Sequence, residues 1–373
     1  MTDGFNADKG LFRVFLSRRR LVMAAAGSVI VGCASAADQP RTIRQRIADR
    51  RAQRMAGDGG VGAPTDRLAD PNALKGEFAV VTELGEFADQ ARAGRKVLWK
   101  AYLPSGASKA PVVIYSHGGG GTRESGRIYG EHLASHGIGA LHIQHIGTDR
   151  DAFRENPQQI SEAARNPKAG APRYEDVGFV VRELRRGSPL GGRIDAARLG
   201  VAGHSLGAIT TLIAAGQFVE GYGQSLAAPD IKGAFALSPS PPRKGYGDAA
   251  TAFDKMLAPI FHLTGTEDDA PNGDFQAPAR RIPFDETTNV DQRLLILKGA
   301  NHFTFGGDPN PQLRGQSFAY PGLERHHDLI KAASVLFWRS VFDGDAAAKQ
   351  FLDGGAFKSL LGPDDTLEFK PAR

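Results

Sequence analysis

The sequence predicts an α/β fold with a mostly parallel central sheet of about eight strands and helices on both faces. From about residue 75 onward, short apolar runs that end at Gly or Pro alternate with segments of helical spacing. The run APVVIYSHGGGG (residues 110–121) is apolar until its final turn, which is typical of a strand buried on both faces. The 373 residues, 41% hydrophobic and 23% charged, suit one large domain of this kind.

The individual elements follow from these runs in chain order. We expect two strands at residues 77–84 and 95–104, joined by a loop that contains Gly85 and Gly94. Six further strands are expected at residues 110–121, 138–147, 197–205, 231–239, 258–265 and 292–299. Helices are expected at residues 125–137, 173–187, 205–216 and 323–342. This alternation favours βαβ units and hence a parallel sheet.

Two segments, residues 147–172 and 239–256, are too polar and irregular for a core. Both follow predicted strands, so we expect them over the carboxyl edge of the sheet, where ligands bind in such folds. Together with residues 270–291, they are predicted to be lid-like insertions or walls of a binding site.

Residues 1–36 are expected to be an export signal. Three arginines at positions 18–20 precede an apolar run, and residues 17–22 resemble a twin-arginine signal. Residues 30–33 resemble a lipobox, which would leave a lipidated Cys33 at the mature terminus, whereas Ala34, Ser35 and Ala36 resemble a site of soluble release. The mature protein is therefore expected to be exported, as a periplasmic protein, a membrane-anchored lipoprotein or a secreted protein.

Residues 37–74 are expected to be an Arg-rich segment followed by a Gly/Pro linker, and residues 75–373 to be the catalytic domain. The net charge of +5 comes from Arg and Lys residues in the first 54 positions, so the remaining chain is close to neutral and a nucleic-acid partner is disfavoured. Because Cys33 is the sole cysteine of the sequence, an intramolecular disulfide is excluded.

The segment GHSLG (residues 203–207) fits G-x-S-x-G and stands between a predicted strand and a predicted helix. A strand that turns sharply into a helix needs small residues on both sides of the residue at the turn. Ser205 would then stand above the sheet edge at a helix N-terminus, where backbone N–H groups favour negative charge. The pattern predicts that Ser205 is a nucleophile.

A serine hydroxyl needs a base, and the base needs an orienting acid. His302 follows a predicted strand and is assigned as general base and then general acid. Glu267, Asp268 and Asp269 follow the preceding strand, in the chain order that this arrangement requires. We assign Asp268 as the orienting carboxylate, with Asp269 and Glu267 as open alternatives.

Acyl transfer also needs donors for the oxyanion. The Leu206 amide is one, because it follows the nucleophile. The second is expected from the loop at residues 117–121, where Gly119 is the first choice and Gly120 the next. No G-K-[ST] follows these glycines, so a phosphate-binding loop is disfavoured.

The segments SHGGGG, GHSLG, TGTEDD and GANHF, in this order, resemble the α/β-hydrolase superfamily. The closer resemblance is to the dienelactone hydrolase-like, platelet-activating-factor acetylhydrolase-like and polyester-hydrolase-like branch, over about residues 78–355. Dienelactone hydrolases proper use a cysteine nucleophile, whereas this position is Ser205. The resemblance therefore implies ester hydrolysis rather than their particular reaction.

The sequence thus predicts an exported serine esterase that acts on small-molecule or polymeric carboxylic esters through an acyl-enzyme. A peptidase, thioesterase or acyltransferase on the same residues, and a non-catalytic envelope binding protein, remain alternatives. No cofactor and no metal site is implied, and the oligomeric state is not predicted.

Several other polar residues are assigned supporting roles. Arg173 and Asp176 are expected to pair with each other on a helix and brace the site. His326 and His327 are expected on the surface of the last long helix. Pocket-lining positions are assigned to His117, Gly120, His145 and His204.

Overall fold

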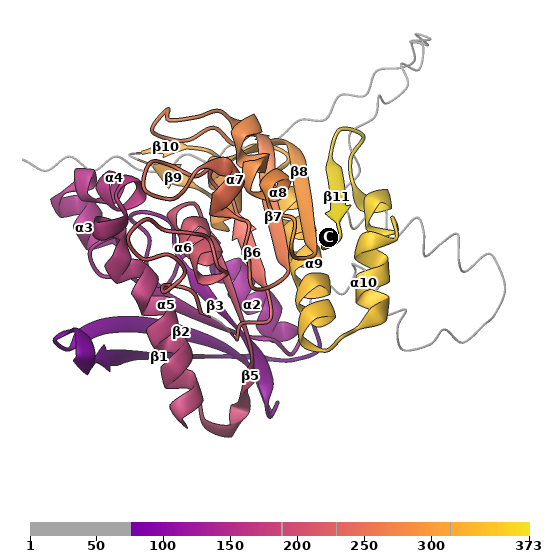
Figure 1. The fold of residues 1–373 in the computed structure, drawn as a ribbon. Coiled ribbons are helices and arrows are strands. Elements are labelled where there is room, and N and C mark those ends of the chain that lie inside the picture. Colours follow the sequence, from indigo (N-terminus) through magenta and orange to yellow (C-terminus); the bar gives the residue numbers. More distant parts are fainter. Residues whose placement is uncertain (1–75, 188, 229, 314) are drawn as a thin grey trace, which may run out of the picture. The chain divides into compact units, whose positions relative to one another are not determined.

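The computed structural model describes residues 76–373 except residues 188, 229 and 314. Its main feature is a nine-stranded sheet in the order β1-β2-β4-β3-β5-β6-β7-β8-β11, which runs in Figure 1 from the indigo strands to yellow β11. The strands are β1 (Val80–Asp89), β2 (Arg95–Pro104), β3 (Ala110–Ser116), β4 (Gly139–Gln144), β5 (Ile194–His204), β6 (Ala234–Leu237), β7 (Ile260–Glu267), β8 (Gln292–Asn301) and β11 (Thr366–Lys370).

Strands β3 to β8 are parallel, and β1, β2 and β11 add antiparallel edges. The predicted α/β-hydrolase fold is confirmed. The additional strand is β11, which sequence reasoning did not predict. It is five residues long, and an edge strand of this length has too few positions to show a clear alternation.

Helices cover both faces of the sheet. Helices α2 and α9 contribute to the apolar cluster on one face, and α5 and α6 contribute to the cluster on the other. All seven residues of β3 are buried, because both of its faces are covered. The helices are α2 (Arg127–Ser135), α3 (Arg150–Glu155), α4 (Pro157–Arg165), α5 (Pro167–Gly187), α6 (Leu206–Ala214), α7 (Ala249–Ala252), α8 (Ile282–Glu286), α9 (Leu323–Phe342) and α10 (Ala346–Asp353), and a small hairpin pairs β9 (Gln312–Leu313) with β10 (Gln316–Ser317).

The expected loop between the first two strands is shorter than predicted. Gly85 lies inside β1, opposite Trp99 of β2. A β-carbon at Gly85 would lie 2.2 Å from the Trp99 ring, so the glycine makes room for the indole within a continuous ladder. The sequence prediction was wrong here because glycine usually marks a turn.

The three segments predicted to be lid-like contain short helices, and residues 270–291 hold a 3-10 helix (Ala277–Arg281) and α8. Residues 147–172 contain α3, α4 and the start of α5. Residues 239–256 are less peripheral than predicted, because Phe253 and Met256 are buried in the core. Their apolar side chains are too widely spaced in a polar background to show a periodic pattern.

The surface assignment of His326 and His327 was wrong, since both are buried. His327 Nε2 lies 2.9 Å from the carbonyl oxygen of Thr304, and His326 Nδ1 lies 2.5 Å from the hydroxyl of Tyr320. His327 therefore ties α9 to the turn that follows β8, and His326 ties it to the segment between β10 and α9.

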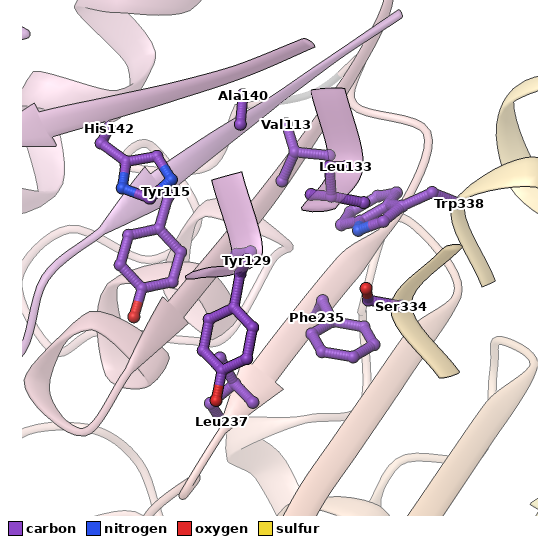
Figure 2. Close-up of a pocket in the computed structure, with 11 residues that line it drawn as sticks. Val113, Tyr115, Tyr129, Leu133, Ala140, His142, Phe235, Leu237, Ser334 and Trp338 are labelled. Carbon is purple, nitrogen blue, oxygen red and sulfur yellow. The ribbon is translucent and has the colours of Figure 1, made fainter. Parts of the chain in front are cut away.

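A small cavity of about 20 Å³ lies between the sheet and helices α2 and α9. Figure 2 shows the Tyr115, Tyr129 and Phe235 rings around it. Its lining is almost entirely apolar and includes none of Ser205, Asp268 and His302. We interpret it as a packing void rather than a substrate site, because it has room for little more than a water molecule.

The predicted export signal (residues 1–36), the lipidated Cys33 and the Arg-rich linker (residues 37–74) lie outside the described residues. Within the described part of the chain, none of the helices combines the length and apolarity needed to span a bilayer.

Candidate active site

Ser205 stands at a sharp turn between β5 and α6. Its φ of 58° and ψ of −116° are strained for a residue with a side chain. The flanking glycines explain how the turn is accommodated. A β-carbon at Gly203 would lie 2.4 Å from the Gly207 carbonyl oxygen, and one at Gly207 would lie 2.0 Å from the Ser116 carbonyl oxygen. Only glycine permits both approaches, and the Ser205 side chain stays partly exposed.

Three side chains from separate strand ends form one hydrogen-bonded chain. The Ser205 hydroxyl oxygen lies 2.9 Å from Nε2 of His302, and Nδ1 of His302 lies 2.8 Å from Oδ1 of Asp268. Asp268 follows β7 and is fully buried, and Thr264 donates a hydrogen bond to its other oxygen at 2.9 Å. The arrangement can pass a proton from Ser205 to His302 while Asp268 orients the ring.

The neighbouring carboxylates have other positions. Glu267 and Asp269 are exposed. The Asp269 carboxylate accepts a hydrogen bond from the Ala277 amide at 2.8 Å, so it anchors the loop that follows β7. In the part of the chain that the structure describes, Asp268 is the one of these three acidic residues that contacts His302.

Two backbone amides close to Ser205 differ from the Gly120 amide in their hydrogen bonding. The Gly120 amide donates to the Thr148 carbonyl oxygen at 2.9 Å, so it is occupied. The amides of Gly119 and Leu206, in contrast, have no hydrogen-bond acceptor among the described residues. A β-carbon at Gly118 would lie 3.4 Å from the Ser205 β-carbon, which shows that this loop adjoins Ser205. The two unoccupied amides could hold an oxyanion there.

Helix α4 lies against the glycine loop. A β-carbon at Gly119 would lie 2.4 Å from Cγ2 of Ile160, an atom of this helix. Therefore the segment predicted to be a lid contacts the loop that carries the candidate oxyanion donor.

A buried polar network supports this loop from below. Arg173 is 1% exposed and donates hydrogen bonds to Thr210 (2.7 Å), to Thr148 (2.9 Å) and to the His117 carbonyl oxygen. Burial lowers the pKa of Arg173 to about 9. The expected Arg173–Asp176 pair was wrong, since Asp176 pairs with Arg95 instead, with Nε 2.8 Å from Oδ1. The reason is that Arg173 points toward α6 and the glycine loop.

His117 and His145 do not line an accessible pocket, which corrects the sequence assignment. Both are fully buried. His145 lies 3.0 Å from the Asp176 carboxylate and 3.0 Å from the Ser116 hydroxyl, and its backbone amide donates to His117 Nε2 at 3.0 Å. Burial lowers the pKa of His145 to about 4. These rings support the site instead of contacting a ligand.

His204 lies directly beside the base. Its Nε2 is 2.9 Å from the His302 carbonyl oxygen, and the two rings are 4.9 Å apart. Burial lowers the pKa of His302 below its ordinary value of 6.5, while contact with Asp268 raises it. The net direction is downward, so the ring is neutral at pH 7, as a general base requires.

Known proteins are similar to this chain over most of its length. Cutinase 1 of Thermobifida cellulosilytica is 31% identical over 300 residues, which cover 80% of this chain and 92% of that protein. The chain belongs to the cutinase family of α/β-hydrolases. Cutinase 2 of the same organism and cutinase cut1 of Thermobifida fusca are each 25% identical over 306 residues, which cover 92% and 76% of those proteins. No protein-family model matches the chain.

Sequence reasoning missed one residue that contacts the family's candidate machinery. Arg280 lies in a short 3-10 helix (Ala277–Arg281), and its Nε is 2.8 Å from Oδ1 of Asp268. Its segment carries no motif, and two adjacent arginines ordinarily indicate a solvated surface. The signal is purely spatial, because the loop folds back onto the end of β7.

Proposed function

We propose that this protein is a serine hydrolase that cleaves carboxylic esters through an acyl-enzyme. The supporting observation is the continuous chain from Asp268 through His302 to Ser205, beside two unoccupied amides. Ser205 attacks the ester carbonyl carbon while its proton moves to Nε2 of His302. The Gly119 and Leu206 amides stabilise the negative charge on the carbonyl oxygen.

Collapse of this tetrahedral intermediate breaks the bond to the alcohol. His302 returns its proton to the departing alcohol oxygen, and the acyl group remains on Ser205. A water molecule then attacks the acyl carbon, gives its proton to His302 and releases the acid, and His302 returns that proton to Ser205. Asp268 orients His302 throughout.

An apolar wall supports an apolar ester as the substrate class. Phe303 follows the base directly, and its ring centroid is 5.9 Å from that of His302. It stacks on Phe318, which follows the β9–β10 hairpin, at a centroid separation of 3.9 Å. Because relatives are named cutinases, we extend the proposal to polymeric esters. A panel of esters, thioesters, peptides and polyester films tests this and separates thioesterase, peptidase and acyltransferase activity.

We further propose that the enzyme acts after export, on the evidence of its leader sequence. A Cys33→Ala variant tests the lipid anchor. We expect it to leave the membrane fraction and to lose the mass of a lipid. If the variant remains in that fraction, the proposal of a lipid anchor at Cys33 is refuted.

Replacement of the nucleophile tests the central proposal. We expect Ser205→Ala to abolish p-nitrophenyl ester turnover and labelling by a fluorophosphonate probe, whereas Ser317→Ala, at an exposed serine of β10, leaves both unchanged. Asp268→Asn is expected to lower kcat by about 10⁴-fold, and Asp269→Asn to have little effect. Labelling of Ser205→Ala at the wild-type level would refute the assignment.

A further inference from the structure

A buried arginine joins the loops that carry the candidate acid and base. Arg280 is 1% exposed, and its guanidinium lies among acceptors from two strand-end loops. Nη1 donates at 3.0 Å to the carbonyl oxygen of Ser238 and at 3.0 Å to that of Pro239, both after β6. Nε contacts the carboxylate and the carbonyl oxygen of Asp268, after β7.

The same guanidinium reaches a third strand end. Its Nη2 lies 2.9 Å from Nδ1 of His302, which follows β8. Oδ1 of Asp268 lies 2.8 Å from both that ring nitrogen and Nε of Arg280. One carboxylate oxygen is therefore shared between the base and the arginine, and the planar guanidinium spans both partners.

The contact between Nη2 of Arg280 and Nδ1 of His302 is not an ordinary hydrogen bond. Nδ1 of His302 carries a hydrogen when it donates to Asp268, so it cannot also accept one from Arg280. When the ring becomes an imidazolium, two cations face each other at 2.9 Å. The contact therefore opposes positive charge on the ring, in competition with Asp268.

We propose that Arg280 is a positioning residue of the triad, which holds Asp268 against His302 and whose charge extends the activity of the base toward lower pH. The inference rests on the proposed function of Ser205, Asp268 and His302. Two separable properties of the Arg280 side chain are involved. The planar guanidinium contacts Asp268 and His302 together, and its positive charge opposes protonation of the His302 ring.

Few charged or titratable groups face the His302 ring among the described residues. His302 is faced by Asp268 from β7, by Arg280 from the 3-10 helix and by His204 from β5. Burial lowers the pKa of His204 well below its ordinary value, so that ring is neutral near pH 7. The Asp269 carboxylate is turned to the Ala277 amide. Removal of the Arg280 charge therefore leaves Asp268 as the dominant charge at the ring.

The test compares charge-removing and charge-keeping variants of the full chain. The kcat/KM for a p-nitrophenyl ester is measured between about pH 4 and pH 9 for wild type, Arg280→Gln and Arg280→Lys. We expect Arg280→Gln to move the acid limb upward by roughly one pH unit, because a neighbouring charge shifts a titration by this order. We expect Arg280→Lys to keep the limb in place, yet to lower kcat about tenfold or more, since one ammonium cannot span both partners.

Arg281→Gln is the matched control. Arg281 is the adjacent residue. It is partly exposed and pairs with Asp285 and Glu368 instead of the triad. This variant is expected to keep the wild-type profile. Thermal unfolding of each variant shows whether it is folded. If Arg280→Gln does not fold, the test is whether kcat of folded Arg280→Lys falls while its KM stays unchanged.

The results that overturn the inference are specific. An acid limb of Arg280→Gln that coincides with that of Arg281→Gln eliminates the role of charge, and an unchanged kcat of Arg280→Lys eliminates the role of the fork. Ser205→Ala is assayed alongside. If it loses turnover while the Arg280 variants behave as wild type, the proposed function stands and the inference alone fails.

Discussion

Replacement of Arg173 by methionine tests whether its buried hydrogen bonds set the position of the glycine loop that carries the proposed oxyanion donor. The side chain makes three hydrogen bonds, to Thr210, Thr148 and the His117 carbonyl oxygen. Each hydrogen bond from a charged donor contributes about 1.5–3 kcal/mol, while burial of the guanidinium costs several kcal/mol. We therefore expect Arg173→Met to lower the free energy of unfolding by about 2–4 kcal/mol.

A second effect of this substitution concerns catalysis. The His117 carbonyl oxygen loses its donor two residues before Gly119, so the loop is free to shift relative to Ser205. A misplacement of about 1 Å reduces rates by about 100-fold. We expect kcat to fall by this order while KM changes little, because the contact proposed for the Gly119 amide is with the transition state.

Denaturant unfolding and steady-state ester kinetics measure the two effects. Arg182→Met is the control, since Arg182 is an exposed residue of the same helix α5. If Arg173→Met matches Arg182→Met in both stability and kcat, the network does not hold the loop, and the reasoning is refuted.

Three further predictions follow from the same structure. Gly207→Ala is expected to abolish activity, because its β-carbon would lie 2.0 Å from the Ser116 carbonyl oxygen, and wild-type turnover of a folded variant would contradict this. Phe318→Ala is expected to raise KM for long-chain more than for acetyl esters, since it removes the ring stacked on Phe303, and an equal effect on both argues against an apolar wall. The free energy of unfolding is expected to fall as the pH drops below about 6.5, by up to about 1.4 kcal/mol per pH unit per buried histidine, because the folded rings have lowered pKa values and the unfolded chain binds more protons. The histidines concerned are His142 (pKa about 3), His145, His262 and His326 (pKa about 4 each). Thermal unfolding at several pH values measures the effect. An unfolding temperature that does not change between neutral and mildly acid pH would contradict the prediction.

Much of the fold was predictable because its signals are local. The continuous apolar run at residues 110–116 reflects a strand covered on both faces, and that burial is visible in the residue types themselves. The elbow at Ser205 was predictable for the same reason, since a strand, two glycines and a helix are adjacent in the chain.

The order of acid and base along the chain also pointed to Asp268 and His302, because each follows a strand. What the sequence could not decide was which carboxylate faces the ring. Strand alternation does not extend into the loop, and the choice among Glu267, Asp268 and Asp269 depends on how the loop turns after β7.

The tertiary structure alone decided the partners of the long charged side chains. Arg173 reaches α6 and the glycine loop rather than Asp176, and Arg280 reaches three strand ends from a segment without a motif. Such contacts join residues far apart in the chain, and an arginine side chain can extend in many directions from one backbone position. The position of Ser205, the sharp turn that carries it and the sheet were therefore determined by local sequence, whereas the contacts that hold them in place arise from packing between distant loops.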